Sequence, residues 1–283
     1  MRLEAILGDD DEARGAACAA CMTAPEHERS AFAAKLALAA REAMAAVVEL
    51  ETTGKDCRAH STVLGRACVG LSLLRVEGAK SALLRIADEG SIAVKRTLAE
   101  ALRETTTAEG RATLVYLLSD DDVRGDAIVA IGDKPWPAVL PLLIEVAEAD
   151  EKCARLAATG IARCGATAGP DETNAAADFL LEQLDDEGSQ SAAVLALLRF
   201  GAAFPGVAEK ARKLAKEAGS RKAVGLCLIA AIDEANASLL EVALSGSKTD
   251  EKACRKFLDP LLGDPDERIR SAAERTLKAL DLR

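Results

Sequence analysis

One stretch near the end of the chain decides the fold: Leu261-Leu262-Gly263-Asp264-Pro265-Asp266-Glu267-Arg268-Ile269-Arg270-Ser271-Ala272-Ala273-Glu274-Arg275-Thr276-Leu277-Lys278-Ala279-Leu280. Gly and Pro end one helix and start the next, so the stretch predicts a helix end, an acidic turn and a second amphipathic helix. Similar stretches occur upstream. Such self-similarity predicts a helical repeat array, because one unit cannot bury its apolar face until a neighbour stacks on it.

The upstream copies share an acid four residues before a base and a small or apolar residue three residues after it. The clearest copies centre on Arg14, Arg124, Arg155, Arg255 and Arg270. Weaker copies centre on Arg58, Lys95 and Lys222, and the segment near Ser189 lacks the base. Successive bases in the middle of the chain stand about 30 residues apart. That spacing corresponds to two short helices and two turns.

Clusters of Gly and Pro separate the expected helices, because both residue types end helices. The expected helix pairs are 76–89 with 91–104, 108–118 with 121–131, 136–148 with 151–164, 172–184 with 189–200, and 206–218 with 221–232. Three further helices are expected near 236–245, 250–262 and 266–281. One of the three has no obvious mate, so we expect residues 236–283 to form an irregular carboxy-terminal cap.

The segment 26–53 contains neither Gly nor Pro. Its apolar residues recur at three- and four-residue steps at Phe32, Leu36, Ala39, Ala43, Val47 and Leu50. This spacing predicts one long helix of about seven turns. Two interpretations remain open: an oversized first helix that covers the end of the array, or a docking helix through which the protein forms a homo-oligomer.

The run Leu262-Gly263-Asp264-Pro265-Asp266-Glu267-Arg268-Ile269-Arg270-Ser271-Ala272-Ala273 resembles a unit of HEAT repeats, particularly the short bacterial kind found in phycobilisome-lyase-type proteins. The resemblance implies an all-α, right-handed α-solenoid of stacked antiparallel helix pairs, with about seven to eight repeats in a single domain 1–283. It also implies that the acidic residue of the turn and the basic residue that follows it are framework residues, which connect a turn to the neighbouring repeat. These residues are Asp264, Asp266 and Arg270, with Asp120 and Arg124, or Asp10 and Arg14, as counterparts. The unit 172–200 departs from the pattern because it lacks the Arg.

The net negative charge of the chain, with 36 Lys and Arg and 46 Asp and Glu, argues against a protein that binds nucleic acid along its whole length. One basic cluster includes Lys213, Lys216 and Arg221, and it is either a solvated helix face or a binding patch. Trp136, the only Trp, lies between two prolines and either anchors a partner or packs under a turn. These four residues are the candidate partner-binding residues.

The sequence contains no motif that is typical of a catalytic or metal-binding site. His27 and His60 are the only histidines, whereas HEAT-type deoxyhypusine hydroxylases need several His-Glu pairs. Cys18 and Cys21 form a single Cys-x-x-Cys without the further ligands that zinc requires. The acidic clusters at 9–12 and 120–122 suit either calcium or helix capping, and capping is expected because both precede a helix and lack an EF-hand spacing. We therefore expect no cofactor and no enzymatic activity.

The first residues carry too short an apolar run for a signal peptide, and charged residues interrupt the apolar segment 30–50. With eight scattered cysteines, these features predict a cytoplasmic protein without a membrane span. We expect a non-enzymatic protein–protein interaction scaffold or adaptor that binds a protein partner, of unknown identity, on its concave or edge surface. The alternatives are a HEAT-like DNA glycosylase or other nucleic-acid-binding protein, and a chromophore lyase. A glycosylase would need a basic groove with aromatic residues, which are sparse here.

Overall fold

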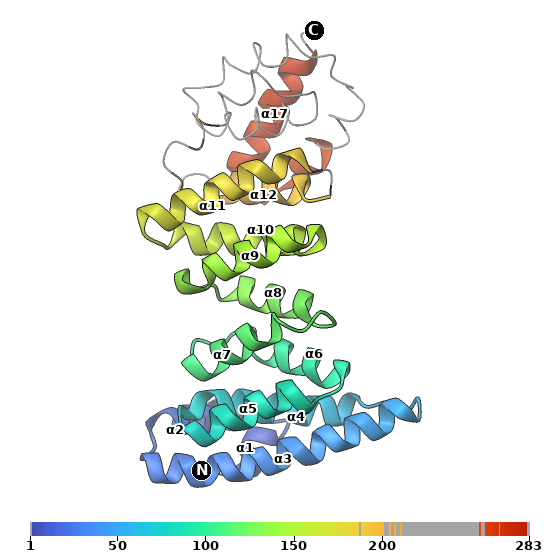
Figure 1. The fold of residues 1–283 in the computed structure, drawn as a ribbon, viewed down its shortest axis with the longest axis vertical. Helices are drawn as coiled ribbons and strands as arrows, with labels where there is room; N and C mark the ends of the chain where they lie inside the picture. The colour runs from blue at the N-terminus through green and yellow to red at the C-terminus, as the bar shows by residue number, and fades with distance from the viewer. Residues whose placement is uncertain are drawn as a thin grey trace. The chain divides into compact units, whose positions relative to one another are not determined.

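A computed structural model describes residues 2–186, 188–200, 258–265 and 267–281, together with 204, 207, 210 and 255. This part of the chain is all-helical and contains no strand (Figure 1). The chain divides into two compact units, Met1–Lys134 and Pro135–Arg283, and each is described by itself. No helix within the described ranges is both long and apolar enough to cross a membrane.

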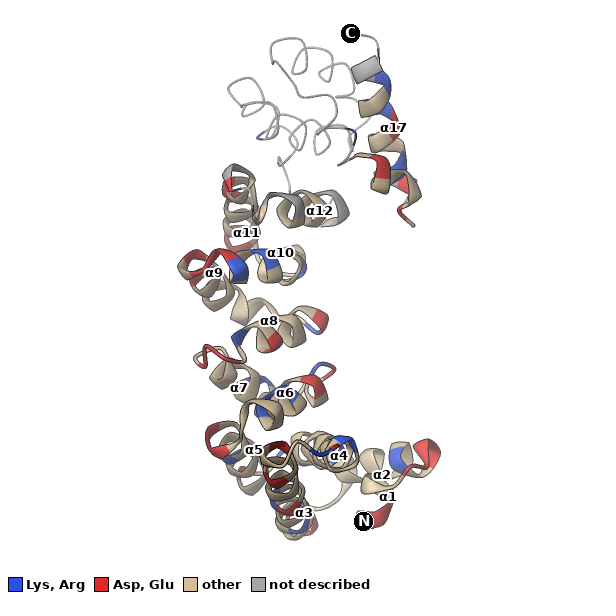
Figure 2. Ribbon diagram, turned by 90° about the vertical axis from the view of Figure 1, so that its right-hand side faces the viewer, with Lys and Arg blue, Asp and Glu red and all other residues tan. Residues whose placement is uncertain are grey.

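The first unit is built from consecutive helices that pack side by side. They are α1 (Leu3–Leu7), α2 (Asp11–Thr23), α3 (Glu26–Thr52), α4 (Arg58–Leu74), α5 (Glu77–Glu89), α6 (Ile92–Ala101), α7 (Ala108–Leu117) and α8 (Arg124–Asp133). Helices α3, α5 and α7 pack in one row, and α2, α4, α6 and α8 pack in a second row beside it (Figure 2). Consecutive helices therefore pair across the two rows, as the sequence predicts for 76–89 with 91–104 and for 108–118 with 121–131.

The long helix expected over 26–53 is α3, which spans Glu26–Thr52. It begins directly after Pro25, and Gly54 follows its end with a φ of 66°, in the left-handed region that glycine adopts without strain. One face is buried against α4 and α5 through Phe32, Ala33, Leu36, Ala40, Ala43 and Val47. Four of the six residues of the expected apolar stripe lie on this face, whereas Ala39 and Leu50 are only half-buried. Burial of one face therefore explains most of the periodicity.

The second unit continues the helical pattern. Its described elements are η1 (Pro137–Val139), α9 (Leu140–Ala149), α10 (Glu151–Ala166), α11 (Pro170–Glu182), η2 (Gln183–Asp185), α12 (Gln190–Phe200), η5 (Asp259–Gly263) and α17 (Glu267–Asp281). Helix α10 packs on α9, α11 and α12, and α17 packs on η5. The expected pairs 136–148 with 151–164 and 172–184 with 189–200 match α9 to α12. The expected helices 206–218, 221–232 and 236–245 lie outside the described residues, apart from isolated positions.

Three bases of the repeated motif close the turn in front of their own helix. Arg14 donates to the carbonyl oxygen of Gly8 at 3.0 Å, and Arg124 donates to that of Leu118 at 2.8 Å. Arg270 donates in the same way to the carbonyl of Asp264 at 2.6 Å. Each acceptor lies six residues before the base, so the sequence repeat corresponds to a repeated hydrogen bond in these three copies. Arg155, by contrast, is exposed. Asp266 lies outside the described residues.

The acidic cluster at 9–12 caps its helix, as expected, whereas the cluster at 120–122 does not cap α8. The Asp10 carboxylate accepts hydrogen bonds from the backbone N–H groups of Glu12 and Ala13, both at 3.0 Å. It thereby satisfies amides that have no partner within the helix and complements the helix dipole. Asp120 accepts one from the N–H of Asp122 at 3.1 Å within the turn before α8, and the N-cap residue of α8 is Val123, which makes no side-chain cap.

Charged and polar side chains also join one helix pair to the next. The pairs lie 25 to 32 residues apart in the chain and are Lys95 with Asp120, Arg96 with Asp126, Arg103 with Asp133, Tyr116 with Asp88, and Lys210 with Asp178. The contact between Lys95 Nζ and Asp120 Oδ2 is short, at 2.6 Å, and both side chains are mostly buried. Hydrogen bonding from Lys95 lowers the pKa of Asp120, although partial burial opposes this shift. These pairs repeat at the period of the sequence motif.

We predict that Asp120→Asn lowers the free energy of unfolding at pH 7 by about 1–2 kcal/mol, because it removes the charge from a partly buried hydrogen bond. The stabilisation of the folded state by the ionised Asp120 carboxylate is complete above the ordinary Asp pKa of about 3.9. It is lost as the pH falls through the lower pKa that Asp120 has in the folded state. Urea unfolding across the acid range should therefore show the two proteins converging. Asp121→Asn is the control, because Asp121 is exposed and its pair with Arg124 should contribute less than about 0.5 kcal/mol. A pH-independent difference would contradict the prediction.

A second prediction concerns the close approach of α10 and α11. A Cβ atom at Gly165 would lie 2.5 Å from the Cβ of Ala176, which is closer than two carbon atoms can approach. Gly165→Ala should therefore destabilise the protein by about 1–3 kcal/mol. Gly78→Ala is the matched control, because its Cβ would meet nothing within 4 Å on α5. It should stabilise the protein by about 0.5–1 kcal/mol, as Ala replaces Gly in an exposed helix. Thermal unfolding of both variants tests whether the melting temperature falls in Gly165→Ala and rises in Gly78→Ala.

Candidate partner-binding groove

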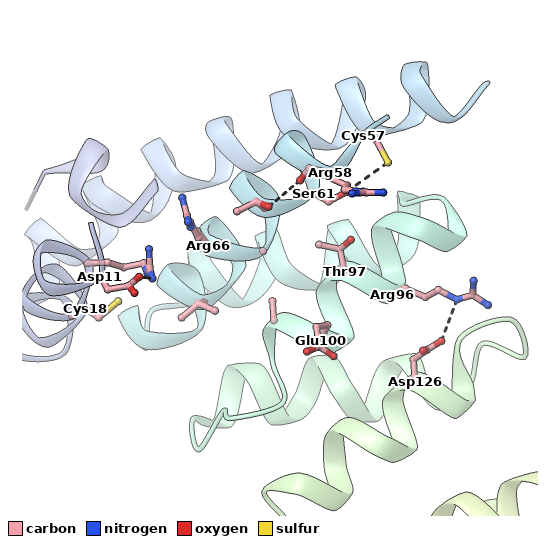
Figure 3. A pocket seen from close by; sticks show the side chains of 16 residues that line it. Asp11, Cys18, Cys57, Arg58, Ser61, Arg66, Arg96, Thr97, Glu100 and Asp126 are labelled. Atoms are coloured by element: carbon pink, nitrogen blue, oxygen red, sulfur yellow. Dashed lines mark hydrogen bonds and ion pairs between the residues drawn. The ribbon is translucent and has the colours of Figure 1, made fainter. Parts of the chain in front are cut away.

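The first unit contains a groove with a volume of about 930 Å³. It runs across the row formed by α2, α4, α6 and α8 (Figure 3). The lining residues are Asp11, Arg14, Gly15, Cys18, Cys57, Arg58, Ser61, Thr62, Gly65, Arg66, Val69, Arg96, Thr97, Glu100, Ala101 and Asp126. We call this feature the α2–α8 groove. It is the candidate site because it combines a concave surface with charged side chains from several helices.

Small residues keep the α2–α8 groove open. A Cβ atom at Gly15 would meet nothing within 4 Å, so α2 presents bare backbone to the open space. A Cβ at Gly65 would meet only Thr97 Cγ2 at 3.7 Å and Ala101 Cβ at 3.8 Å. The groove therefore results from short side chains on neighbouring helices of the same row, which leave room for another molecule to approach the backbone.

Two of the four arginines in the groove serve the framework. Arg14 binds the carbonyl oxygen of Gly8 and pairs with Asp11. Arg66 donates to the carbonyl of Leu7 at 2.9 Å and to a carboxylate oxygen of Asp9 at 2.8 Å. Their side chains are only 26% and 21% exposed, and both guanidinium groups donate hydrogen bonds within the protein. These two arginines hold the turn between α1 and α2 against α4 and so shape one end of the groove.

The other two arginines present donors to solvent. The side chain of Arg58 is 92% exposed and that of Arg96 is 60% exposed. Arg58 approaches Asp56 through Nε at 3.6 Å, and Arg96 approaches Asp126 through Nε at 3.3 Å. Among the described residues, neither arginine uses its terminal Nη atoms for these contacts. Figure 3 shows both side chains at the same end of the groove, which therefore offers planar donor pairs suited to a carboxylate or phosphate group.

Carboxylates interrupt this positive charge. Asp11, Glu100 and Asp126 also line the groove. Glu100 pairs with Arg103 at 3.0 Å, and Asp126 faces Arg96. The groove therefore has mixed charge rather than the continuous positive charge that a phosphate backbone requires. Mixed charge on a concave surface with small residues is better suited to a polypeptide.

The thiols of the Cys-x-x-Cys motif show no sign of activation. Burial raises the pKa of Cys18, which lines the groove, and the nearby Arg14 offsets only part of this effect. Burial likewise raises the pKa of Cys21 to about 11. Both are free thiols that stay protonated at neutral pH, whereas nucleophiles and metal ligands need the thiolate. Within the part of the chain that the structure describes, no three His, Cys, Asp or Glu side chains gather to hold a metal ion.

Of the four sequence-predicted binding residues, the structure describes Trp136, which does not line this groove. Trp136 lies at the start of the second unit, at the N-cap of η1, where it is half-buried. Its backbone N–H is hydrogen-bonded to the thiol of Cys164, whose pKa burial nevertheless raises to about 12. Lys213, Lys216 and Arg221 lie outside the described residues.

Sequence reasoning missed Arg58 and Arg96 as candidate binding residues. Arg58 stands in one of the weaker copies of the repeated motif, with Gly54 at the position where the motif has its acid. Arg96 follows the framework base Lys95 directly and so lies on another side of α6. A missing acid does not by itself separate the two roles, because Ser91 stands at that position before Lys95, which serves the framework through Asp120.

Comparison with known proteins does not assign the chain to a family. No protein-family model matches it, and no curated protein matches it. Among solved structures, the crystal structure of an engineered protein from the Northeast Structural Genomics Consortium aligns with 99% of this chain and 77% of its own length. The sequence identity is 16% and the TM-score is 0.43, which is too low to support an argument about fold or function.

Proposed function

We propose that this protein is a non-enzymatic scaffold, built as a HEAT-like right-handed solenoid, that binds a segment of a partner protein in the α2–α8 groove. The observation that carries the proposal is the exposed pair Arg58 and Arg96 at one end of a groove whose wall is bare backbone at Gly15. The repeat of turn-closing arginines in the sequence and the ion pairs between successive helix pairs support the solenoid. Stacked repeats provide extended concave surfaces for such binding.

The chemistry of the groove favours a peptide with an acidic side chain. Its volume of about 930 Å³ suits a short segment rather than a whole domain surface. The small residues allow the partner's backbone to approach closely, and the arginine donors match a carboxylate in a bidentate geometry. Exposed charges at the rim contribute to the rate and specificity of association more than to affinity.

Nucleic-acid binding is the second candidate, because the terminal nitrogens of Arg58 and Arg96 would fit phosphate oxygens equally well. The carboxylates of Asp11, Glu100 and Asp126 weigh against it, since they lie in the same groove and would repel a phosphate backbone. A chromophore lyase is supported only by the resemblance of the repeat, and no feature of the groove favours it.

We predict that selection of random peptides on the immobilised full chain enriches sequences with Asp or Glu among small and apolar residues. Binding of a selected peptide should weaken at least about tenfold in Arg58→Gln/Arg96→Gln, because the variant removes both exposed guanidinium groups. Fluorescence anisotropy of the labelled peptide measures the change. Arg85→Gln is the matched control, because Arg85 lies on α5 outside the groove and pairs only with the exposed Glu89.

Selected peptides that bind the double glutamine variant as tightly as the unaltered protein would overturn the assignment of this site. A parallel titration with labelled DNA at low salt tests the second candidate, because phosphate contacts are strongest there. DNA binding that is lost in the same variant, together with no enriched peptide, would replace the protein-scaffold proposal with nucleic-acid binding.

A further prediction uses the open space at Gly15. Gly15→Leu should fill the groove without a clash, since nothing lies within 4 Å of the added Cβ. It should leave the fold intact, raise stability slightly through better helix propensity, and weaken peptide binding at least about tenfold. Gly78→Leu makes the same change at an open position on α5 outside the groove. Unaltered binding by the Gly15→Leu variant would show that the peptide lies elsewhere.

A further inference from the structure

Glu100 places an exposed carboxylate in the α2–α8 groove, and its side chain is 70% exposed. Arg103 donates to the two oxygens of Glu100 through Nη1, at 3.1 and 3.0 Å. The Nε and Nη2 atoms of Arg103 contact Asp133 instead, both at 2.6 Å. Because a carboxylate offers about four acceptor sites, Glu100 can still accept hydrogen bonds from a bound molecule.

Glu100 stands at a fixed spacing from one of the exposed arginines. It lies one turn beyond Arg96 on α6, so the two side chains project on the same side of the helix with their Cβ atoms about 5–6 Å apart. Figure 3 shows Glu100 further along the groove than Arg96, which lies at the end shared with Arg58. The groove therefore presents a positive position and a negative position next to each other.

The lining of the groove suits an extended segment better than a helix. A helix that docks in a groove needs several apolar contacts. Among the described residues that line this groove, Val69 is the only large apolar side chain. Ser61, Thr62 and Thr97 contribute hydroxyl groups instead, and hydroxyl groups can bind the peptide groups of an extended chain.

The geometry of an extended chain matches the spacing of the two charges on α6. Alternate side chains of an extended chain point to the same side and lie about 6.5–7 Å apart. This distance is close to the separation of Arg96 and Glu100, and both are long side chains that can adjust to the difference. Adjacent residues of an extended chain point to opposite sides, so they do not match the pair.

We propose that the partner segment is extended and carries an acidic residue and, two positions away, a Lys or Arg. The acidic residue binds the terminal nitrogens of Arg58 and Arg96, and the basic residue binds the carboxylate of Glu100. This inference rests on the proposed function, because it concerns the same groove, and it adds the residue that decides which acidic segments bind.

The other charged residues of the groove favour a segment of mixed charge. Arg14 and Arg66 pair with carboxylates of the protein where they shape the other end of the groove. Asp126 contacts Nε of Arg96 at 3.3 Å, so an acidic residue of the partner that binds Arg96 also approaches Asp126. A segment with a second acid opposite Glu100 would add another repulsion, whereas a basic residue there replaces it with attraction. Glu100 therefore discriminates against segments that carry only acids.

Binding of peptides selected on the full chain tests the inference. Selection should enrich sequences with Asp or Glu at one position and Lys or Arg two positions away. For one labelled peptide, Glu100→Gln in the protein and replacement of the basic residue by Gln in the peptide should each weaken binding about threefold to fivefold. Fluorescence anisotropy measures both changes. The two together should weaken binding no further than either alone, because both remove the same contact.

Charge reversal provides a second test of the contact. Glu100→Lys should weaken binding of the selected peptide at least about tenfold. It should bind the peptide with Glu in place of its basic residue more tightly than the unaltered protein does. Glu104→Gln is the matched control, because Glu104 is 76% exposed, pairs with Lys134 and lies outside the groove, so binding should not change. Thermal unfolding verifies that each variant is folded.

The outcomes separate this inference from the proposed function. Peptides that require Arg58 and Arg96 but bind Glu100→Gln as tightly as the unaltered protein would overturn the inference and leave the proposed function intact. Additive losses from the changes in protein and peptide would also overturn it, because the two residues would then not be in contact. Peptides that bind without Arg58 and Arg96 would overturn the proposed function and the inference together.

Discussion

The helices of this protein depend on close packing against their neighbours, because their alanine- and glycine-rich faces provide little apolar area individually. At Gly165 the helices α10 and α11 approach so closely that a Cβ would lie 2.5 Å from Ala176. At Gly70 the same constraint brings Leu36 of α3 and Ile6 of α1 onto the surface of α4. Such contacts are individually weak and collectively large. Within each unit, neighbouring helix pairs therefore stabilise one another.

Polar contacts specify how the packed helices follow one another. Arg14, Arg124 and Arg270 close the turns that precede their own helices, which fixes where each helix begins. Lys95 and Asp120 then join one helix pair to the next through a mostly buried hydrogen bond. Buried charges are costly unless paired, so these contacts discriminate against incorrect arrangements of otherwise similar apolar faces.

The residues that make the framework possible also create its binding surfaces. Small residues that let helices pack closely leave open space where no neighbour covers them, as at Gly15 in the α2–α8 groove. On the opposite row, Leu38 and Val48 project from α3 away from the core.

The sequence by itself determined the local features: the all-helical class, the bounds of α3, the presence and order of the pairs from α5 to α12, and the capping role of Asp10. Each depends on residues within one or two turns, namely Gly and Pro at the ends, apolar spacing and a carboxylate before the first amide. Only the tertiary structure decided that Arg66 is used internally while Arg58 and Arg96 face a groove. These roles depend on the distances between side chains on different helices, about 30 residues or more apart in the chain, and packing sets those distances.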